Sequence, residues 1–265
     1  MQLKAITARD LLDRVLYRDG LMLVVDKPAG LPVHRGPKGG GSLEDHFDAL
    51  RFGLPRAPAL AHRLDKDTSG CLVLGRHRKA LAHLGVLFKH GKVGKTYWAV
   101  VEGGPEAAEG TIDLPLGRLN KERGWWMKPD PDGLPSTTRY QVLGRQPPAA
   151  PEPGSPAARA ITWLALEPVT GRTHQLRVHC AASGFPIVGD DIYGNAPRFT
   201  GPPQMLHARE VVVPVSKNKP PVRVTAPVPE HMRAALRACG WSGEEATGAA
   251  DPAAPDGGSG HRPES

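Results

Sequence analysis

The sequence predicts an α+β fold: a mixed, largely antiparallel sheet flanked by helices. Several short apolar segments have the β-branched content and the bounding turn residues of strands. Segments with a helical apolar face occur only occasionally between them. Strands and helices do not alternate in the regular order that would indicate a parallel βαβ sheet.

The first quarter of the chain combines short elements with turns. Residues 7–16 are expected to form a helix capped by Thr7, and residues 21–25 a buried strand that ends in a Lys-Pro-Ala-Gly turn. The glycine-rich residues 36–41 are expected to form a mobile loop, because they lack the pattern of a phosphate-binding loop. Ser42 and Asp45 resemble a capping box that opens a helix through about residue 50.

The rest of the chain supplies most of the sheet. An apolar strand is expected at residues 71–74, a helix at residues 78–89 and a strand at residues 96–101. Further strands are expected at residues 137–143, 160–166, 210–215 and 222–225, with a helix at residues 173–183.

Composition suggests one folded domain over residues 1–239. Residues 146–158, rich in proline and alanine, are expected to form a flexible insertion, and residues 240–265 a disordered acidic tail. Neither segment contains enough apolar surface to offset the entropy lost on ordering.

The charge distribution favours a polyanionic partner. The chain of 265 residues has a formal net charge of +7. From residue 240 onward there are five acids and one base, a net charge of −4, so the remaining 239 residues have a net charge of +11. A body this basic suits RNA or DNA, although a merely soluble basic protein would show the same excess.

Cysteine usage and hydropathy indicate a reducing, cytoplasmic setting. The three cysteines show no C-x-x-C spacing, which argues against a disulfide framework or a structural zinc site. The early aliphatic run at residues 21–25 is too short for a signal peptide or a membrane span. His174, His179 and Cys180 lie near one another in sequence, but their spacing favours packing or RNA contact, and no metal site is expected.

The most informative segment is H-R-L-D-K-D-T-S-G at residues 62–70, which leads directly into an apolar strand. It places two carboxylates, Asp65 and Asp67, and two cations in one loop, where catalytic groups are commonly held. Taken alone, a solvated charged turn would explain the segment equally well.

This segment does not stand alone, because the chain resembles the RluA-type pseudouridine synthases in five blocks. The loop is similar to that family's H-R-L-D-x-x-T-S-G signature. Similar blocks occur, in the family's order, at residues 25–34 (V-D-K-P-A-G-L-P-V-H), 95–99 (K-T-Y-W-A), 168–179 (P-V-T-G-R-T-H-Q-L-R-V-H) and 186–194 (P-I-V-G-D-D-I-Y-G), followed by L-H-A at residues 206–208. The resemblance spans roughly residues 18–229.

The resemblance implies a pseudouridine synthase domain with a catalytic cleft across its sheet, which isomerises uridine in RNA without a cofactor. The bond from ribose C1′ to uracil N1 breaks, the base rotates, and a bond from C1′ to C5 forms. By this resemblance Asp65 is the catalytic carboxylate. It attacks C1′, attacks the uracil ring, or promotes a glycal intermediate, and the sequence does not distinguish these routes.

Two further catalytic residues follow from the matching motifs. Arg177 matches the family's arginine that pairs with the aspartate, and a buried carboxylate needs such a cation to stay ionised. Tyr97 matches the family's active-site tyrosine, which stacks on the target base and is a candidate general base for the C5 proton.

The expected RNA contacts surround these three residues. Arg63 resembles the arginine that contacts or fills the gap left by a flipped nucleotide. The other expected contacts are His62, Leu64, Thr68, Lys95, Arg172, His174 and Gln175. Trp125 and Trp126 form an aromatic step in a basic loop, which could stack on an unpaired base or anchor the loop.

The expected substrate is a stem-loop of ribosomal or transfer RNA, and the expected protein is a monomer without a membrane partner. Only about twenty residues precede the first expected strand, too few for the extra S4-type RNA-binding domain of many relatives. Two alternatives remain: a non-catalytic RNA-binding relative, and a glycosidase or N-glycosylase that uses Asp65 with Asp67 as a carboxylate pair.

Overall fold

The computed structural model describes residues 6–36, 39–120, 125–148, 160–198, 200–216 and 218–243. The strands are β1 (Val15–Arg18), β2 (Met22–Lys27), β3 (Ala59–Leu60), β4 (Ser69–Gly75), β5 (Gly94–Glu102), β6 (Glu109–Asp113), β7 (Leu116–Arg118), β8 (Met127–Pro129), β9 (Thr137–Gln146), β10 (Ile161–Pro168), β11 (Leu206–Val213) and β12 (Val222–Thr225). The helices are α1 (Ala8–Leu12), the 3₁₀ helix η1 (Leu43–Leu50), α2 (Arg78–Lys89), α3 (Gln175–Ala182) and α4 (Glu230–Ala238).

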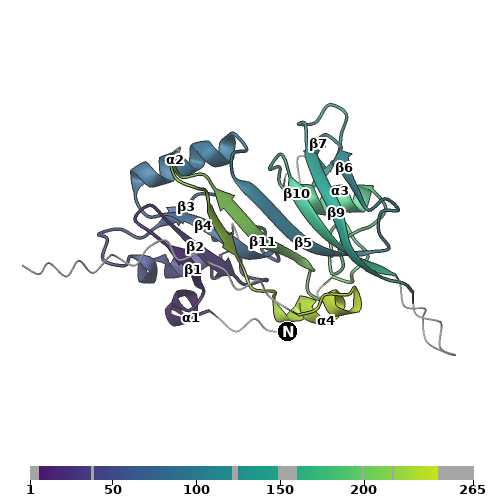
Figure 1. The fold of residues 1–265 in the computed structure, drawn as a ribbon, viewed down its shortest axis with the longest axis horizontal. Helices are drawn as coiled ribbons and strands as arrows, with labels where there is room; N and C mark the ends of the chain where they lie inside the picture. Colours follow the sequence, from purple (N-terminus) through teal and green to yellow (C-terminus); the bar gives the residue numbers. More distant parts are fainter. Residues whose placement is uncertain are drawn as a thin grey trace, which may run out of the picture.

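One large mixed sheet connects the two halves of the molecule (Figure 1). Its strand order is β1-β2-β4-β11-β5-β10-β9-β6, with β12 paired to β11 and β3 paired to β4. The pair β4 and β11 is parallel, whereas the other pairs in this order are antiparallel. The hairpin of β7 and β8 stands apart from this sheet. The predicted α+β class is therefore confirmed.

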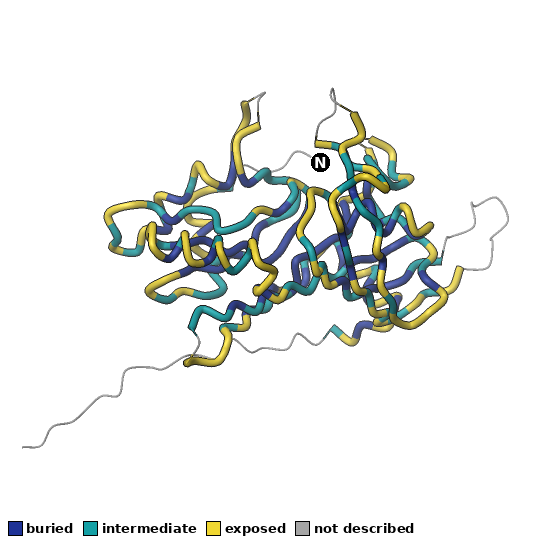
Figure 2. Tube along the Cα trace, turned by 90° about the horizontal axis from the view of Figure 1, so that it is seen from above, coloured by how far each residue is buried: buried dark blue, intermediate teal, exposed yellow. Residues whose placement is uncertain are grey.

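Alternating side chains of the central strands bury both faces of the sheet, because successive residues of a strand point to opposite sides. In the first half, Leu23 and Val25 pack in the cluster that contains η1, whereas Met22 and Val24 pack with α2. In the second half, Ala99 packs in the cluster that contains α3 and Val100 in the cluster that contains α4. Figure 2 shows the buried segments concentrated in the interior of both halves.

Most of the expected elements form, with shifted ends. Residues 78–89 and 222–225 form α2 and β12 with the expected bounds. The expected strand at residues 210–215 begins earlier, since β11 starts at Leu206. The expected capping box is present, with the Asp45 carboxylate accepting a hydrogen bond from the Ser42 N–H, but the element that it opens is a 3₁₀ helix.

The expectation of one helix over residues 7–16 is wrong beyond residue 12. Thr7 does cap α1, but Val15 already belongs to β1, which pairs antiparallel with β2. Val15 and Tyr17 have high strand propensity, and pairing to a buried neighbour strand outweighs the local helical pattern. The elements β3, β6, β7, β8 and α4 were not predicted from the sequence.

The expected insertion and tail fall largely outside the described residues. Residues 149–159 and 244–265 are not described, nor are residues 37–38 of the glycine-rich segment. Trp241, which we placed in the tail, is instead buried against Trp98 and α4. The folded domain therefore extends past residue 239. In the described ranges, no helix is long and apolar enough to span a membrane.

Candidate active site

A cleft of about 370 Å³ opens where the loop before β4, the start of β5 and the amino end of α3 meet. This volume lies within the range of small-molecule pockets. The cleft is lined by ten of the eleven predicted site residues: His62, Arg63, Leu64, Asp65, Thr68, Lys95, Tyr97, Arg172, His174 and Gln175. The eleventh, Arg177, is buried next to Asp65.

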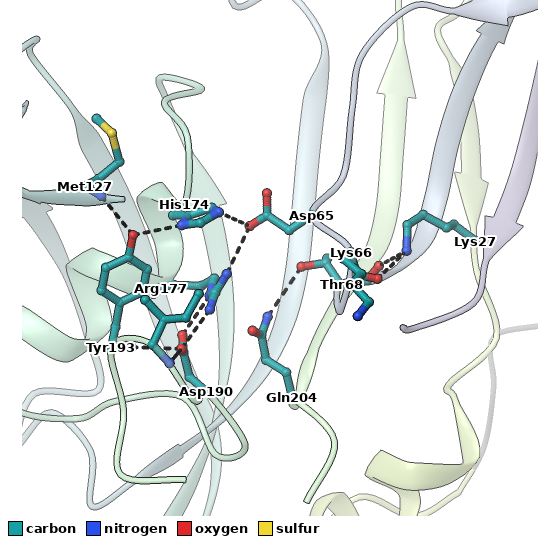
Figure 3. A network of polar contacts seen from close by, with 11 residues as sticks. Lys27, Asp65, Lys66, Thr68, Met127, His174, Arg177, Asp190, Tyr193 and Gln204 are labelled. Atoms are coloured by element: carbon teal, nitrogen blue, oxygen red, sulfur yellow. Dashed lines mark hydrogen bonds and ion pairs between the residues drawn. The ribbon is translucent and has the colours of Figure 1, made fainter. Parts of the chain in front are cut away.

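Lys27 holds the loop that presents Asp65. Its side chain is fully buried, and its Nζ donates to the carbonyl oxygens of Pro28, Lys66 and Thr68 at 2.8, 2.8 and 2.9 Å (Figure 3). These three acceptors match the three hydrogens of an ammonium group. Burial lowers the pKa of Lys27 to about 7, against the opposing charges of Asp67, Asp65 and Asp26. Lys27 thus holds the backbone of this loop in place through three hydrogen bonds.

Asp65 lines the cleft, and the guanidinium of Arg177 and the imidazole of His174 lie beside its carboxylate (Figure 3). Its side chain is 21% exposed, and its Oδ2 lies 3.7 Å from Arg177 Nη1 and 3.8 Å from His174 Nε2. These distances are those of an ion pair rather than of short hydrogen bonds. One face of the carboxylate therefore remains open to a substrate.

Arg177 is oriented chiefly by a second carboxylate, Asp190. The guanidinium donates from Nε and Nη2 to the two Asp190 oxygens at 2.7 and 2.8 Å, a bidentate arrangement. Asp190 Oδ1 also accepts the backbone N–H groups of Ile192 and Tyr193. Burial alone would raise the pKa of Asp190, but the hydrogen bond from Arg177 holds this pKa below its usual value. The remaining nitrogen, Nη1, is thereby aimed at Asp65.

His174 is positioned by Tyr193. His174 is the amino cap of α3 and has a left-handed backbone (φ 51°), a strained conformation that often occurs at functional sites. The Tyr193 hydroxyl accepts from Met127 N–H at 2.9 Å and lies 2.8 Å from His174 Nδ1. The hydroxyl can thus donate a hydrogen bond to Nδ1, and in that tautomer the proton of the ring is on Nε2, which faces Asp65. Burial lowers the pKa of His174, which favours the neutral ring.

Tyr97 occupies the centre of the sheet, opposite Leu166 on β10 and Ala208 on β11. It packs against the clusters of both halves and lines the cleft. Burial, and then the charge of Asp65, raise the pKa of Tyr97 above its usual value. The side chain therefore presents a neutral phenol.

Several predicted RNA contacts have their polar groups occupied by the protein. Gln175 receives Thr170 Oγ1–H and Arg172 N–H at its oxygen and donates to Thr137 O and Thr138 Oγ1. His62 Nε2 accepts the Val73 N–H at 3.0 Å, and its ring stacks on Phe88. Both side chains shape the cleft wall. In the same way, Leu64 is a core residue, and Thr68 is buried.

Three of the predicted contacts are cations at the cleft. Arg63 and Arg172 are exposed, and Arg172 Nε donates to Pro135 O at 3.2 Å. Lys95 is partly buried, and burial lowers the pKa of its amine. Asp67 does not line the cleft. Asp65 is the sole acid among the described lining residues, so Asp67 does not form a facing carboxylate pair with it.

Metal ligation finds no support in the described ranges, where no group of three His, Cys, Asp or Glu side chains could hold an ion. His179 instead contacts Thr138 Oγ1 and Leu114 O, and Cys180 is buried in the α3 cluster.

The residues that sequence reasoning missed are Asp190, Tyr193 and Lys27. All three lie in blocks that carried the family resemblance, G-D-D-I-Y-G and V-D-K-P. The available signals were an acid, Asp190, shortly after the helix that contains Arg177, and a tyrosine, Tyr193, three residues later.

Comparison with known proteins agrees with this geometry. A model of the family described as RNA pseudouridylate synthase matches residues 21–182. The chain is 41% identical to an uncharacterised RNA pseudouridine synthase of Zymomonas mobilis, over 82% of this chain and 94% of the relative. It is 36% identical to the ribosomal large subunit pseudouridine synthase C of Vibrio cholerae, over 84% and 68%.

Two solved human structures share the fold. RNA Pseudouridylate Synthase Domain Containing 4 has a TM-score of 0.69 at 26% identity and covers 88% of this chain and 95% of its own. RNA Pseudouridylate Synthase Domain Containing 1 has a TM-score of 0.68 at 29% identity, over 89% and 90%.

Proposed function

The chain belongs to the RluA-type RNA pseudouridylate synthase family, whose members are isomerases, and we propose on that basis that Asp65 is its catalytic carboxylate, acting on a flipped-out uridine of ribosomal or transfer RNA. The observation that supports this most directly is the pairing of one cleft-facing carboxylate, Asp65, with a guanidinium that Asp190 holds in place.

The reaction asks little of the protein except charge and position. The N1–C1′ bond breaks, the uracil turns, the C5–C1′ bond forms, the C5 proton leaves and N1 takes up a proton, so atoms balance without an oxidant or reductant. Each of the three routes open to Asp65 begins from its ionised form. Arg177, 3.7 Å away, stabilises that negative charge in a site from which RNA would exclude water.

Tyr97 is proposed to hold the uracil through its ring. Its raised pKa makes the phenolate scarce near neutral pH, which disfavours Tyr97 as the group that removes the C5 proton. The ring lies at the centre of the sheet and borders the cleft, where it could stack on the base during rotation.

Flipping the nucleotide out of its stack is proposed because a glycosidic bond inside a helix is out of reach of a side chain in a cleft. Arg63, Lys95 and Arg172 would then neutralise phosphates on both sides of the flipped uridine. The net charge of +11 on residues 1–239 would add a longer-range attraction.

Ribosomal RNA is supported as substrate by the relatives named ribosomal large subunit pseudouridine synthase C, and transfer RNA stem-loops remain part of the proposal. We propose a cytoplasmic location, which suits the three free, buried thiols, and we propose that the enzyme is a monomer. Among the described residues that line the cleft Asp65 is the single carboxylate, which disfavours a glycosidase, because that reaction needs two.

The proposal is tested by mapping pseudouridine across total RNA from cells with and without the gene. We expect one or a few positions to lose the modification and to regain it when the gene is restored. An unchanged map, together with release of free uracil from RNA by the purified protein, would show an N-glycosylase instead.

A further inference from the structure

The hairpin of β7 and β8 presents an exposed aromatic ring beside the cleft. Trp125, two residues before the start of β8, is 56% exposed. Its contacts with Trp126 and His174 are both edge-to-face, at centroid distances of 5.5 and 5.8 Å. More than half of the Trp125 side chain therefore remains accessible beside the cleft, where an aromatic ring offers a large contact surface to a partner.

The neighbouring tryptophan, Trp126, anchors the hairpin. Trp126 is partly buried, its carbonyl accepts the Leu119 N–H at 2.7 Å, and the Arg198 guanidinium lies 5.3 Å from its ring centroid. Because Trp126 supplies the packing that anchors the hairpin, the side chain of Trp125 is not needed for that purpose.

The hairpin and the catalytic carboxylate form one connected unit. Met127 N–H donates to Tyr193, Tyr193 contacts His174, and His174 lies 3.8 Å from Asp65 (Figure 3). One imidazole ring thus separates Trp125 from the residue proposed to act on the target nucleotide. A base that covered Trp125 would belong to a nucleotide within about three positions of that target, since the two contacts of 5.8 and 3.8 Å compare with a strand rise of about 3.4 Å per nucleotide.

The surroundings suit the backbone of such a nucleotide. Arg118, on the paired strand opposite Met127, is exposed, and Arg172 is exposed at the cleft. Exposed arginines beside an open aromatic ring are the combination by which proteins bind unpaired nucleotides, with phosphates on the cations and the base on the ring.

We propose that Trp125 is a base-stacking residue for an unpaired nucleotide that flanks the target uridine. This inference builds on the proposed function and adds a second contact point on the RNA. Since every base has a π face, the contact would hold the substrate in register without selecting a particular base. Its loss should weaken binding about tenfold, toward the lower end of the range for one stacked base, and leave the chemical step alone.

Binding is measured with the full chain and a ten-nucleotide oligouridylate, by tryptophan fluorescence and by anisotropy. Trp98, Trp163 and Trp241 lie together in the α4 cluster and Trp126 is partly buried, so we expect most of the quenching to come from Trp125. Trp125→Phe should keep the affinity within about twofold and lose most of the quenching, and Trp125→Ala should weaken binding about tenfold. Leu143→Ala, an exposed apolar position on β9, is the matched control and should behave as wild type.

Equal quenching in wild type and Trp125→Phe, or no binding of the oligouridylate by wild type, would overturn the inference. On a stem-loop that the mapping identifies, Trp125→Ala should raise KM about tenfold at unchanged kcat, and this penalty should vanish when one flanking nucleotide is abasic. An equal penalty on every abasic RNA would also overturn it. If wild type binds and is quenched but makes no pseudouridine, the proposed function fails while the stacking role stands.

Discussion

At the scale of single residues, the partners that surround Asp65 come from two segments of the chain. Arg177 comes from α3, Asp190 from the turn after it, and His174 from the cap of α3, where Tyr193 fixes its ring. Asp190 and Asp65 thus share one guanidinium, but Asp190 takes the two short bonds. This division explains why Arg177 can be rigid while Asp65 keeps an open face.

Replacing Arg177 by methionine should reduce kcat by about 100-fold or more, since a preorganised charge next to the reacting group is lost, while RNA affinity changes little. It should also cost about 3–5 kcal/mol of stability, because Asp190 would be left as an unpaired buried charge. The double variant Arg177→Met, Asp190→Asn should recover stability but not turnover. Turnover that recovers with stability would mean that Arg177 is structural only.

Lys27 should make stability depend on pH. Its pKa is about 7 in the fold and 10.5 for an ordinary lysine, so between these values the unfolded chain binds more protons. The unfolding free energy should therefore rise with pH over this window, by up to about 1.4 kcal/mol per pH unit. Urea unfolding at pH 7 and pH 9 should show this gain in wild type relative to Lys27→Met. A difference between the two proteins that is independent of pH would contradict the lowered pKa.

The sequence could indicate Asp65, Tyr97 and Arg177 because each lies in a motif with a recognisable pattern. It could not show that Gln175 and His62 turn their polar groups inward, since the acceptors and donors that occupy them come from distant strands. The role of Asp190 was hidden because the turn after α3, rather than any helical or strand period, brings it to Arg177. Hydrogen-bond partners across a sheet are set by register, which a single sequence does not reveal.

At the scale of elements, the catalytic loop ends at the sheet's parallel junction. Ser69 and Gly70 of β4 lie beside His207 and Ala208 of β11. Gly70 has a φ of 103°, and a Cβ at this position would overlap the carbonyl of Ala208. The close approach requires glycine, and it determines where the loop that carries Asp65 leaves the sheet.

Gly70→Ala should destabilise the protein by about 2–5 kcal/mol, because backbone strain and overlap act together. Gly103→Ala is the matched control, since Gly103 also has a positive φ (69°) but open space around it. It should cost about 1 kcal/mol. Equal losses in urea unfolding would show that the approach of β11 does not constrain Gly70.

Element prediction succeeded where a pattern was long and failed where tertiary pairing decided. The apolar face of α2 specified its bounds, whereas β1 reads locally as helix and forms because β2 lies beside it. The strands β7 and β8 are three residues each, too short for any period to be visible. That hairpin nevertheless positions Trp125 and Tyr193 beside the site.

At the scale of the whole molecule, α4 and Trp241 close the far side of the sheet. Trp241 lies 6.4 Å from Trp98 and packs with Met232 and Leu236. A chain ending at Gly243 should therefore keep its stability within about 0.5 kcal/mol and its activity. Trp241→Ala should lose about 3–5 kcal/mol. Similar thermal melts for Trp241→Ala and wild type would contradict the placement of this residue in the core.

We propose that the sheet, the clamped loop and the ion pair of Arg177 with Asp65 together hold one ionised oxygen against a flipped uridine. Asp65→Asn tests it most directly, because the amide keeps the shape of the carboxylate and removes its charge. The measurement is pseudouridine formed by the purified variant on the RNA that the mapping identifies, alongside the RNA dissociation constant and the unfolding free energy. We expect no detectable pseudouridine with affinity and stability nearly unchanged; substantial turnover by a well-folded Asp65→Asn protein would contradict the assignment.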